Sequence, residues 1–208
     1  MKALKNMKNS NRVYVLGAML VGGIVLLIQT GASAVSLNPI NGHYYEIISG
    51  ETAITWEQAN TRANSSVFEG LQGHLATITS QEENDWLSKT FGASHAAWLG
   101  GYQDKEALDY DEPDGGWRWV TGEEWDYAPW APGEPNNWDH GDDINEDKVR
   151  TWPNDGPEIV VNDAPNDPGT PVDKIYVEYE PVATPEPGSM ALLGIGLLGA
   201  AGFRRKKK

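Results

Sequence analysis

The chain reads WAPGEPNN over residues 130–137, a stretch that holds a carboxylate and an amide on either side of a proline. Glu134 and Asn136 flank Pro135, whose ring restricts the backbone. An X-Pro bond held in the cis form would point both side chains the same way. Carboxylate and amide oxygens are the ligands that hard divalent cations prefer. Glycine, proline and asparagine are also common in surface loops, so the stretch alone leaves a cation site and a plain loop open.

Six further segments lie on either side of this stretch in a defined order, at residues 73–84, 98–101, 116–122, 145–147, 162–163 and 175–180. The ordered series resembles the C-type lectin-like domain, and the resemblance covers roughly residues 41 to 180. The segment that starts at Trp98 is similar to the family's Trp-Ile-Gly-Leu core motif, with Leu99 and Gly101 as substitutions. The resemblance implies an α+β fold, in which two helices and small antiparallel sheets carry a long ligand-binding loop.

Local patterns predict where the helices and strands of this fold lie. Thr55 to Gln58 is a capping box that predicts a helix from Trp56 to about residue 65. Residues 80–83 form a second box, before a helix that ends near residue 90. Four β-prone segments are predicted strands, and the last should pair with the first; they are residues 43–48, 96–100, 117–120 and 175–179. Turn residues dominate from 102 to 171, where the resemblance implies the ligand-binding loop.

The resemblance also implies a calcium site with a defined set of ligands. The family's principal site uses the Glu and Asn of Glu-Pro-Asn, a later Glu, and an Asn-Asp pair. Glu134 and Asn136 match the first two ligands, and Glu146 matches the later Glu, although nine residues separate it from Asn136. Either Asn154-Asp155 or the pair Asn162 and Asp163 could complete the set. We favour Asn162 and Asp163, because their spacing to the last strand fits the family.

The same resemblance implies that the ligand is a saccharide. Two adjacent sugar hydroxyls replace waters on the calcium ion and hydrogen-bond to the side chains that coordinate it. Glu-Pro-Asn goes with equatorial 3,4-diols such as mannose, glucose and N-acetylglucosamine, whereas Gln-Pro-Asp goes with galactose. Trp138 lies next to the predicted site and is a candidate for stacking on a sugar ring. The predicted saccharide contacts are Glu134, Asn136, Glu146, Asn162 and Trp138.

Composition narrows the classes of function. The 208 residues include no cysteine, so the disulfides usual in the resembled family are missing, and the core and any bound metal must hold the fold. Residues 35–203 contain seven Lys and Arg against thirty Asp and Glu, a net charge of −23 that disfavours nucleic acid as a partner. Eighteen of these acidic residues fall between Asp104 and Asp163, which suits divalent cations as well as solubility. Common catalytic motifs are missing, so we expect no enzyme.

The amino-terminal end is predicted to be a secretory signal. Lys2, Lys5, Lys8 and Arg12 precede an apolar run over residues 13–28, and the sequence Ala-Ser-Ala at 32–34 offers a site for signal peptidase. We therefore expect residues 1–34 to be a cleaved signal peptide. An uncleaved membrane anchor is the alternative, because the apolar run is nearly long enough to span a bilayer.

The carboxyl-terminal end closely resembles the bacterial PEP-CTERM sorting signal. Pro185-Glu186-Pro187 is followed by an apolar run over residues 190–203 and by a basic end at 204–208. The resemblance implies a transmembrane helix that exosortase removes, in a Gram-negative bacterium that makes exopolysaccharide. A helix of this length would span about 21 Å, less than a bilayer core of about 30 Å. A plain retained anchor is the alternative.

Together these patterns divide the chain into a signal peptide (1–34), a C-type lectin-like domain (35–180), and a linker with the sorting segment (181–208). The first hypothesis is a calcium-dependent carbohydrate-binding module that is exported to the outer cell surface or the extracellular matrix. Its partners would be a saccharide or exopolysaccharide, with signal peptidase, exosortase and the inner membrane met during export. The alternative is an adhesion or matrix scaffold on the same fold that binds no sugar and uses calcium only structurally.

Overall fold

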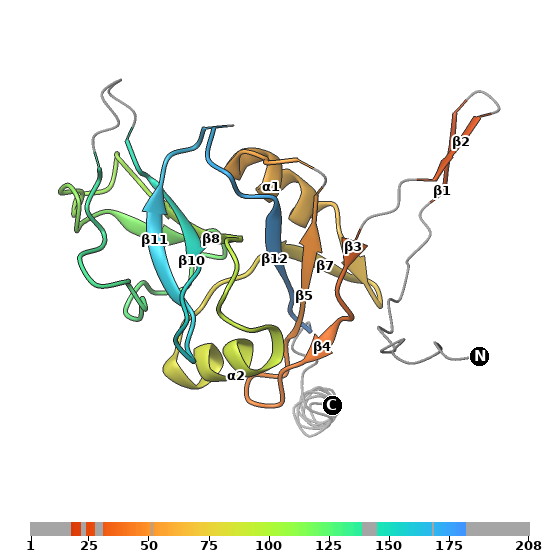
Figure 1. Ribbon diagram of the computed structural model, residues 1–208, viewed down its shortest axis with the longest axis horizontal. Helices are drawn as coiled ribbons and strands as arrows, with labels where there is room; N and C mark the ends of the chain where they lie inside the picture. Colours follow the sequence, from red (N-terminus) through yellow and green to blue (C-terminus); the bar gives the residue numbers. More distant parts are fainter. Residues whose placement is uncertain are drawn as a thin grey trace, which may run out of the picture.

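The computed structural model describes residues 18–21, 24–27, 31–50, 52–138, 145–167 and 169–181. Two helices pack beside one large sheet, and a separate hairpin lies near the amino terminus (Figure 1). The predicted α+β class is confirmed.

Both helices start at the predicted residues. Helix α1 (Trp56–Asn64) begins after Thr55, whose side chain accepts a hydrogen bond from the Gln58 backbone N–H while the Gln58 side chain accepts one from Thr55. This is the predicted capping box. Helix α2 (Gln81–Phe91) is capped by the Ser80 side chain alone, because the Glu83 carboxylate turns away to accept from the Thr79 N–H at 2.8 Å.

The sheet follows the strand order β11–β10–β8–β12–β5–β3, with further strands paired at its sides. The strands on this path are β3 (Gly31–Ala32), β5 (Tyr44–Ser49), β8 (Trp98–Gln103), β10 (Lys148–Trp152), β11 (Val160–Ala164) and β12 (Lys174–Tyr179). The strands off it are β4 (Ser36–Leu37) and β9 (Trp117–Trp119), beside β5 and β8, and β7 (Leu71–Leu75), which pairs with β12 and with β6 (Val67–Phe68). The separate hairpin consists of β1 (Ala18–Val21) and β2 (Ile24–Leu27).

The predicted pairing of the last strand with the first is confirmed, and it runs antiparallel from Lys174 opposite Ser49 to Tyr179 opposite Tyr44. The expectation of small antiparallel sheets needs a correction. Strand β12 also pairs with β8 in parallel, at Ile175 opposite Trp98, so the strands join into one mixed sheet. This connection lets a single sheet link the chain ends to the region of the long loop.

Close packing of α1 against the sheet depends on small residues. Ala59 and Ala63 on α1 are fully buried in an apolar cluster with Leu75 and Val177. A Cβ atom added to Gly73 would lie only 2.9 Å from the carbonyl oxygen of Ala63, so a side chain at this position would push the helix off the sheet. A second buried cluster lies beneath α2 and includes Leu87, Leu99 and Val149 among its members.

Strands β7, β10 and β11 were not predicted, and the last two lie inside the region expected to be a long loop. Strand β11 has the sequence VVNDA, whose polar second half has little intrinsic strand propensity. Five backbone pairs with β10 hold it in the sheet, from Lys148 opposite Ala164 to Trp152 opposite Val160. Tertiary pairing therefore overrides local preference at this position.

The predicted sorting segments fall mostly outside the described residues. Residues 1–17 and the whole tail from residue 182 lie outside the described residues. The described part of the apolar run at 13–28 consists of strands β1 and β2. Among the helices that the structure describes, none has the length and apolar character needed to cross a membrane.

Candidate functional site

The Glu-Pro-Asn loop is held against strand β11 by backbone contacts. Trp130 forms an isolated parallel bridge with Val161, and the Ala131 N–H donates to the Val161 carbonyl at 2.8 Å. The Val161 N–H donates to the carbonyl of Pro129, also at 2.8 Å. The Glu134–Pro135 peptide bond is cis. These contacts bring the loop alongside the two residues that follow Val161.

Asp163 is the fully buried centre of this arrangement, with 0% of its surface exposed. Its carboxylate accepts hydrogen bonds from the backbone N–H of Asn136 at 3.1 Å and of Asn137 at 2.7 Å. Hydrogen bonds to an ionised acceptor are stronger than those between neutral groups. One carboxylate on β11 therefore fixes the backbone of two consecutive loop residues.

Glu146 joins the same loop although nine residues separate it from Asn136. Its carboxylate accepts from the backbone N–H of Trp138 at 2.8 Å, and its own N–H donates to the Asn137 side chain at 3.0 Å. Glu146 is 6% exposed. The separation along the chain therefore does not keep Glu146 away from the loop.

Two oxygen atoms in this cluster lack the hydrogen bonds that buried polar atoms normally make. They are Glu134 Oε2 and Asn162 Oδ1, which are buried and without a hydrogen-bond partner among the described residues. The Asn162 amide nitrogen donates to the backbone carbonyl of Asp163, which leaves the side-chain oxygen as the orphaned atom. Two unsatisfied acceptors beside buried carboxylates leave a place for a cation.

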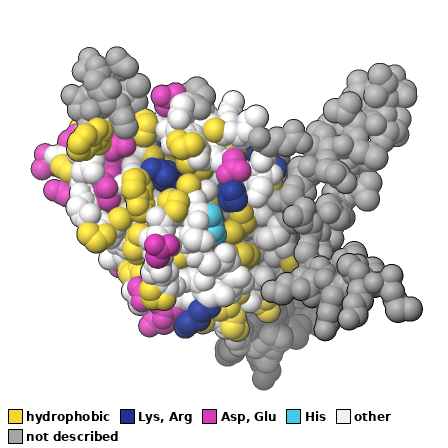
Figure 2. All heavy atoms as spheres, viewed as in Figure 1, with side chains coloured by type: hydrophobic (Ala, Val, Ile, Leu, Met, Phe, Trp, Pro, Cys, Tyr) yellow, Lys and Arg dark blue, Asp and Glu magenta, His cyan; other side chains and the backbone are white. Residues whose placement is uncertain are grey.

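The charges in the cluster also favour a bound cation. Burial, followed by the neighbouring carboxylates of Asp163 and Glu146, raises the pKa of Glu134 to about 7. Arg150 on β10 opposes this effect, but burial lowers the pKa of Arg150 itself. Figure 2 shows Asp and Glu side chains gathered over the loops that follow β8, on the side of the molecule that carries this cluster (Figure 1). Three crowded carboxylates with one nearby guanidinium favour the binding of a positive ion.

The residues present fit a calcium ion, because they offer carboxylate and amide oxygens and no thiolate. The structure brings the carboxylates of Glu134, Glu146 and Asp163 near one another. Asn136 joins them through its backbone N–H, and Asn162 directly precedes Asp163 on β11. Asn154 instead closes a turn of its own, where its side chain accepts from the Gly156 N–H at 2.7 Å and donates to the Glu158 carbonyl at 3.1 Å. The side chain of Trp138 is 65% exposed beside the cluster.

Two residues of the cluster were missed by sequence reasoning. Asn137 contributes both its N–H and its side chain, and its position next to Asn136 could have indicated a role. Arg150 lies directly opposite Asn162 in the pairing of β10 with β11. Its place follows only from the register of two strands that were not predicted.

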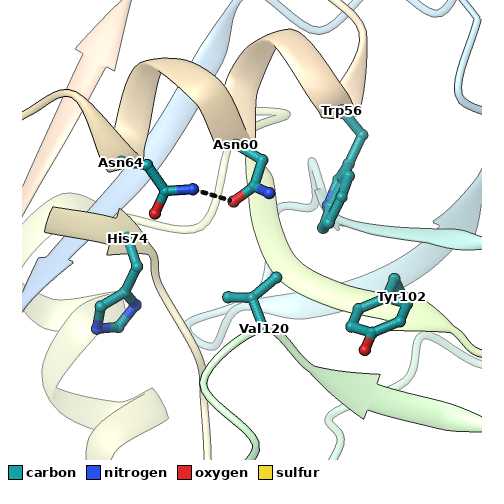
Figure 3. Close-up of a pocket in the computed structure, with 6 residues that line it drawn as sticks. All are labelled: Trp56, Asn60, Asn64, His74, Tyr102 and Val120. Carbon is teal, nitrogen blue, oxygen red and sulfur yellow. Dashed lines mark hydrogen bonds between the residues drawn. The ribbon is translucent and has the colours of Figure 1, made fainter.

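One cavity among the described residues lies elsewhere. It has a volume of about 360 Å³, and none of the predicted site residues lines it. Its walls come from α1, β7 and β8 (Figure 3), and its lining residues are Trp56, Asn60, Asn64, His74, Tyr102 and Val120. The Asn64 amide donates to Asn60 at 3.1 Å across one wall. The cavity and the oxygen cluster are therefore separate features.

Two sequence families match the chain. The Lectin C-type domain matches residues 52–155, half of the chain. The PEP-CTERM protein-sorting motif matches residues 183–206, and this motif implies an exported protein. The predicted resemblances are both confirmed.

Individual relatives agree with the family. Halomucin from Haloquadratum walsbyi is 38% identical over 125 residues, which is 52% of this chain and 1% of that protein. The human C-type lectin domain family 10 member A is 34% identical over 85 residues, 38% of this chain and 23% of that protein. The chain thus spans only a small part of either relative.

Among solved structures, the EPNH mutant of CEL-I, a C-type lectin from Cucumaria echinata, has the same fold. The TM-score is 0.51 at 24% identity, over 70% of this chain and 94% of that chain. The matched family is one of non-enzymatic carbohydrate-binding proteins, which agrees with the prediction that the chain is not an enzyme. By its matched domain, its fold and its relatives, the chain belongs to the C-type lectin domain family.

Proposed function

We propose that this protein binds saccharides through a calcium ion held by Glu134, Asn136, Glu146, Asn162 and Asp163. The observation that carries the proposal is the pair of buried, unpartnered oxygens on Glu134 and Asn162. Glu134 lies near the carboxylates of Asp163 and Glu146, and Asn162 directly precedes Asp163 on β11. Calcium takes six to eight oxygen ligands, a mixture of carboxylates, amide carbonyls and waters. Lectin C-type domains generally bind calcium, which supports this choice of ion.

The saccharide would be recognised by the same side chains that hold the ion. Two adjacent hydroxyls of a sugar replace waters on calcium and bond to the coordinating groups. The Glu134 carboxylate accepts a hydrogen bond from one hydroxyl, whereas the Asn136 amide donates one to the other. This polarity, with the family's use of Glu-Pro-Asn, favours mannose- or glucose-like sugars over galactose. Trp138 is exposed beside the site and could stack on the ring of a bound sugar.

The sorting motif supports a location for this activity. We propose that signal peptidase removes residues 1–34 and that exosortase recognises the tail while it is held in the inner membrane. The mature domain would then lie at the outer cell surface or in the exopolysaccharide matrix of a Gram-negative bacterium. The saccharide partner would be part of that matrix or of a neighbouring cell. The acidic surface makes nucleic acid a poor partner.

A glycan array probed in calcium and again in EDTA tests the saccharide half of the proposal. Thermal melts in both buffers test the calcium half. A ligand that binds only the folded state at a hundredfold excess over its Kd adds about 2.7 kcal/mol to the free energy of unfolding. The melting temperature should therefore rise by several degrees in calcium, and Mg²⁺ at equal concentration serves as the control.

The two measurements also separate the proposal from its rival. Mannose or glucose binding that disappears in EDTA supports the lectin activity. A calcium-dependent rise in melting temperature without affinity for any glycan would assign the chain to the alternative, a matrix scaffold with structural calcium. A melting temperature that does not change at millimolar calcium would overturn the calcium site itself.

A further inference from the structure

A second group of possible metal ligands lies at the opposite end of the fold, where the first and last strands meet. Strand β12 pairs with β5 on one side and with β7 on the other, so Glu178 lies opposite both Tyr45 and His74. Side chains alternate along a strand, so Glu180 shares the face of Glu178, and His43 shares that of Tyr45. We call His43, His74, Glu178 and Glu180 the His–Glu cluster.

The donor atoms of this cluster lie close together. His43 Nδ1 is 2.6 Å from Glu178 Oε1, and His74 Nε2 is 3.3 Å from Glu180 Oε1. One donor atom from each of His43, Glu178 and Glu180 lies within 4.8 Å of the other two. The side chain of Glu178 is 1% exposed and that of Glu180 is 41% exposed. The cluster is therefore anchored in the core and open to solvent at one side.

The orientation of the His74 ring is a second observation that points to a metal ion. Its Nδ1 lies 2.9 Å from the backbone carbonyl of Leu75, and a carbonyl only accepts, so Nδ1 carries the hydrogen. In the neutral ring, the lone pair of Nε2 then faces the Glu180 carboxylate. This Nε2 is buried and forms no hydrogen bond within the described part of the chain. A ring N–H given to a backbone carbonyl is also the usual support of a histidine that binds a metal.

Charge around the cluster favours a cation. The charged groups that act on His43 are the carboxylates of Glu178, Glu180 and Glu83. The Tyr45 hydroxyl lies between two of them and contacts both Glu83 and Glu178. Three carboxylates thus act on His43, and Glu180 also lies beside His74, so a divalent ion would offset a local excess of negative charge.

We propose that the His–Glu cluster binds one divalent transition-metal ion of the zinc class, with His43, Glu178 and Glu180 as ligands and His74 Nε2 beside Glu180 as the fourth. Two imidazoles and two carboxylates suit zinc, whereas calcium prefers oxygen ligands alone. The site shares no residue with the calcium cluster and does not rest on the proposed function. The bound ion would join the entry of β5 to the end of β12 in a chain without cysteine.

Zinc titration of the whole exported protein by calorimetry, in millimolar calcium, tests the proposal. One equivalent of Zn²⁺ should bind, and the melting temperature should rise. His43→Gln and Glu180→Gln should each weaken zinc binding at least tenfold, because loss even of a residue that only supports a metal ligand costs about 10–100-fold. Both variants change side chains that reach solvent, and a cooperative thermal melt in the absence of zinc reports that each variant is folded.

His95→Gln and Glu57→Gln are the matched controls. His95 lies away from the cluster, where its Nε2 is 2.9 Å from the Tyr176 hydroxyl, and Glu57 is an exposed carboxylate on α1. Both variants should bind zinc as the unmodified protein does. Failure of the unmodified protein to bind zinc at micromolar concentration, or equal affinity in His43→Gln and Glu180→Gln, would overturn the proposal whatever becomes of the calcium site.

Discussion

The buried carboxylate of Asp163 accepts a 2.7 Å hydrogen bond from the backbone N–H of Asn137, which lies 26 residues earlier in the chain. This bond ties the Glu-Pro-Asn loop to strand β11. The same carboxylate is a proposed ligand of calcium. The position of the loop and the affinity for the ion therefore depend on one side chain, and a substitution there should affect both.

Asp163→Asn should lower calcium affinity and destabilise the protein even in EDTA. The amide removes the negative charge and offers one oxygen in place of two to the N–H groups of Asn136 and Asn137. A buried hydrogen-bonding group left unsatisfied costs about 1–3 kcal/mol. Calcium titration and thermal melts in EDTA measure the two effects.

Asp155→Asn is the control for this substitution, because Asp155 belongs to the other Asn-Asp pair and is exposed. Its calcium affinity and melting temperature should match those of the unmodified protein. If Asp155→Asn loses calcium and Asp163→Asn keeps it, the assignment of the ligand pair is wrong.

The double substitution Glu134→Gln with Asn136→Asp should change sugar preference while calcium binding largely survives. It reverses which side chain accepts and which donates, and keeps an oxygen ligand at both positions. A hydroxyl that faces a group of the wrong polarity loses about 1–3 kcal/mol. Competition with mannose and galactose measures the change, which should weaken mannose binding. Unchanged mannose affinity would show that the sugar is recognised elsewhere.

Glu46→Gln should stabilise the protein near neutral pH and not at acidic pH. Glu46 is 8% exposed and accepts a hydrogen bond from the Tyr179 hydroxyl. Burial raises the pKa of Glu46 above its ordinary value of 4.5, although Tyr179 and Arg62 pull it down. A pKa that is raised in the folded state means that stability is present at low pH and lost as pH rises through that pKa.

Glutamine carries no charge at any pH, so it avoids this loss. The melting temperature of Glu46→Gln should therefore exceed that of the unmodified protein at pH 7. Each kcal/mol gained in the free energy of unfolding should raise it by about 2–4 °C. The difference between the two proteins should disappear below pH 4.5. The exposed Glu57→Gln should show no such trend. A gap that stays constant with pH would mean that the ionisation of Glu46 does not limit stability.

Mass spectrometry of the native protein should find an amino terminus near Val35 and no peptide from residue 190 onward. Cleavage after Ala34 would remove β3 together with the hydrogen bond from the Ser33 N–H to the Ile47 carbonyl. It would leave β4, which pairs with Tyr44 and Tyr45. The domain should therefore stay folded after processing. Detection of Lys208 in the mature protein would contradict removal of the tail.

Much of the fold could be predicted from local chemistry. Thr55 and Ser80 marked the start of each helix because their side chains satisfy N–H groups that a helix leaves free. The alternation from Ile175 to Tyr179 marked the central strand. Strand β11 could not be predicted, because Asn162 and Asp163 are poor strand residues that pairing with β10 holds in place.

Part of the candidate site could also be predicted, because a sequence motif marks three of its residues. Glu134, Asn136 and Glu146 follow a motif in which spacing along the chain carries the information. Arg150 follows no motif, because its role depends on standing opposite Asn162 across two strands. The His–Glu cluster likewise follows no sequence motif. His74 and Glu178 lie on strands β7 and β12, and His43 and Glu180 lie next to the ends of β5 and β12, so only the register of these strands brings the side chains together.

The pairing of Tyr44 with Tyr179 has a consequence for how the domain can be carried by other proteins. Strand β4 pairs with β5 on the side away from β12, and adjacent strands lie about 5 Å apart. The processed chain would therefore enter and leave the domain about two strand spacings apart. A host protein could accept the whole domain within one surface loop without distortion, and the natural ends could be joined by a short linker to make a circular permutant. The same geometry suits a module that matches only 1% of a chain as long as halomucin.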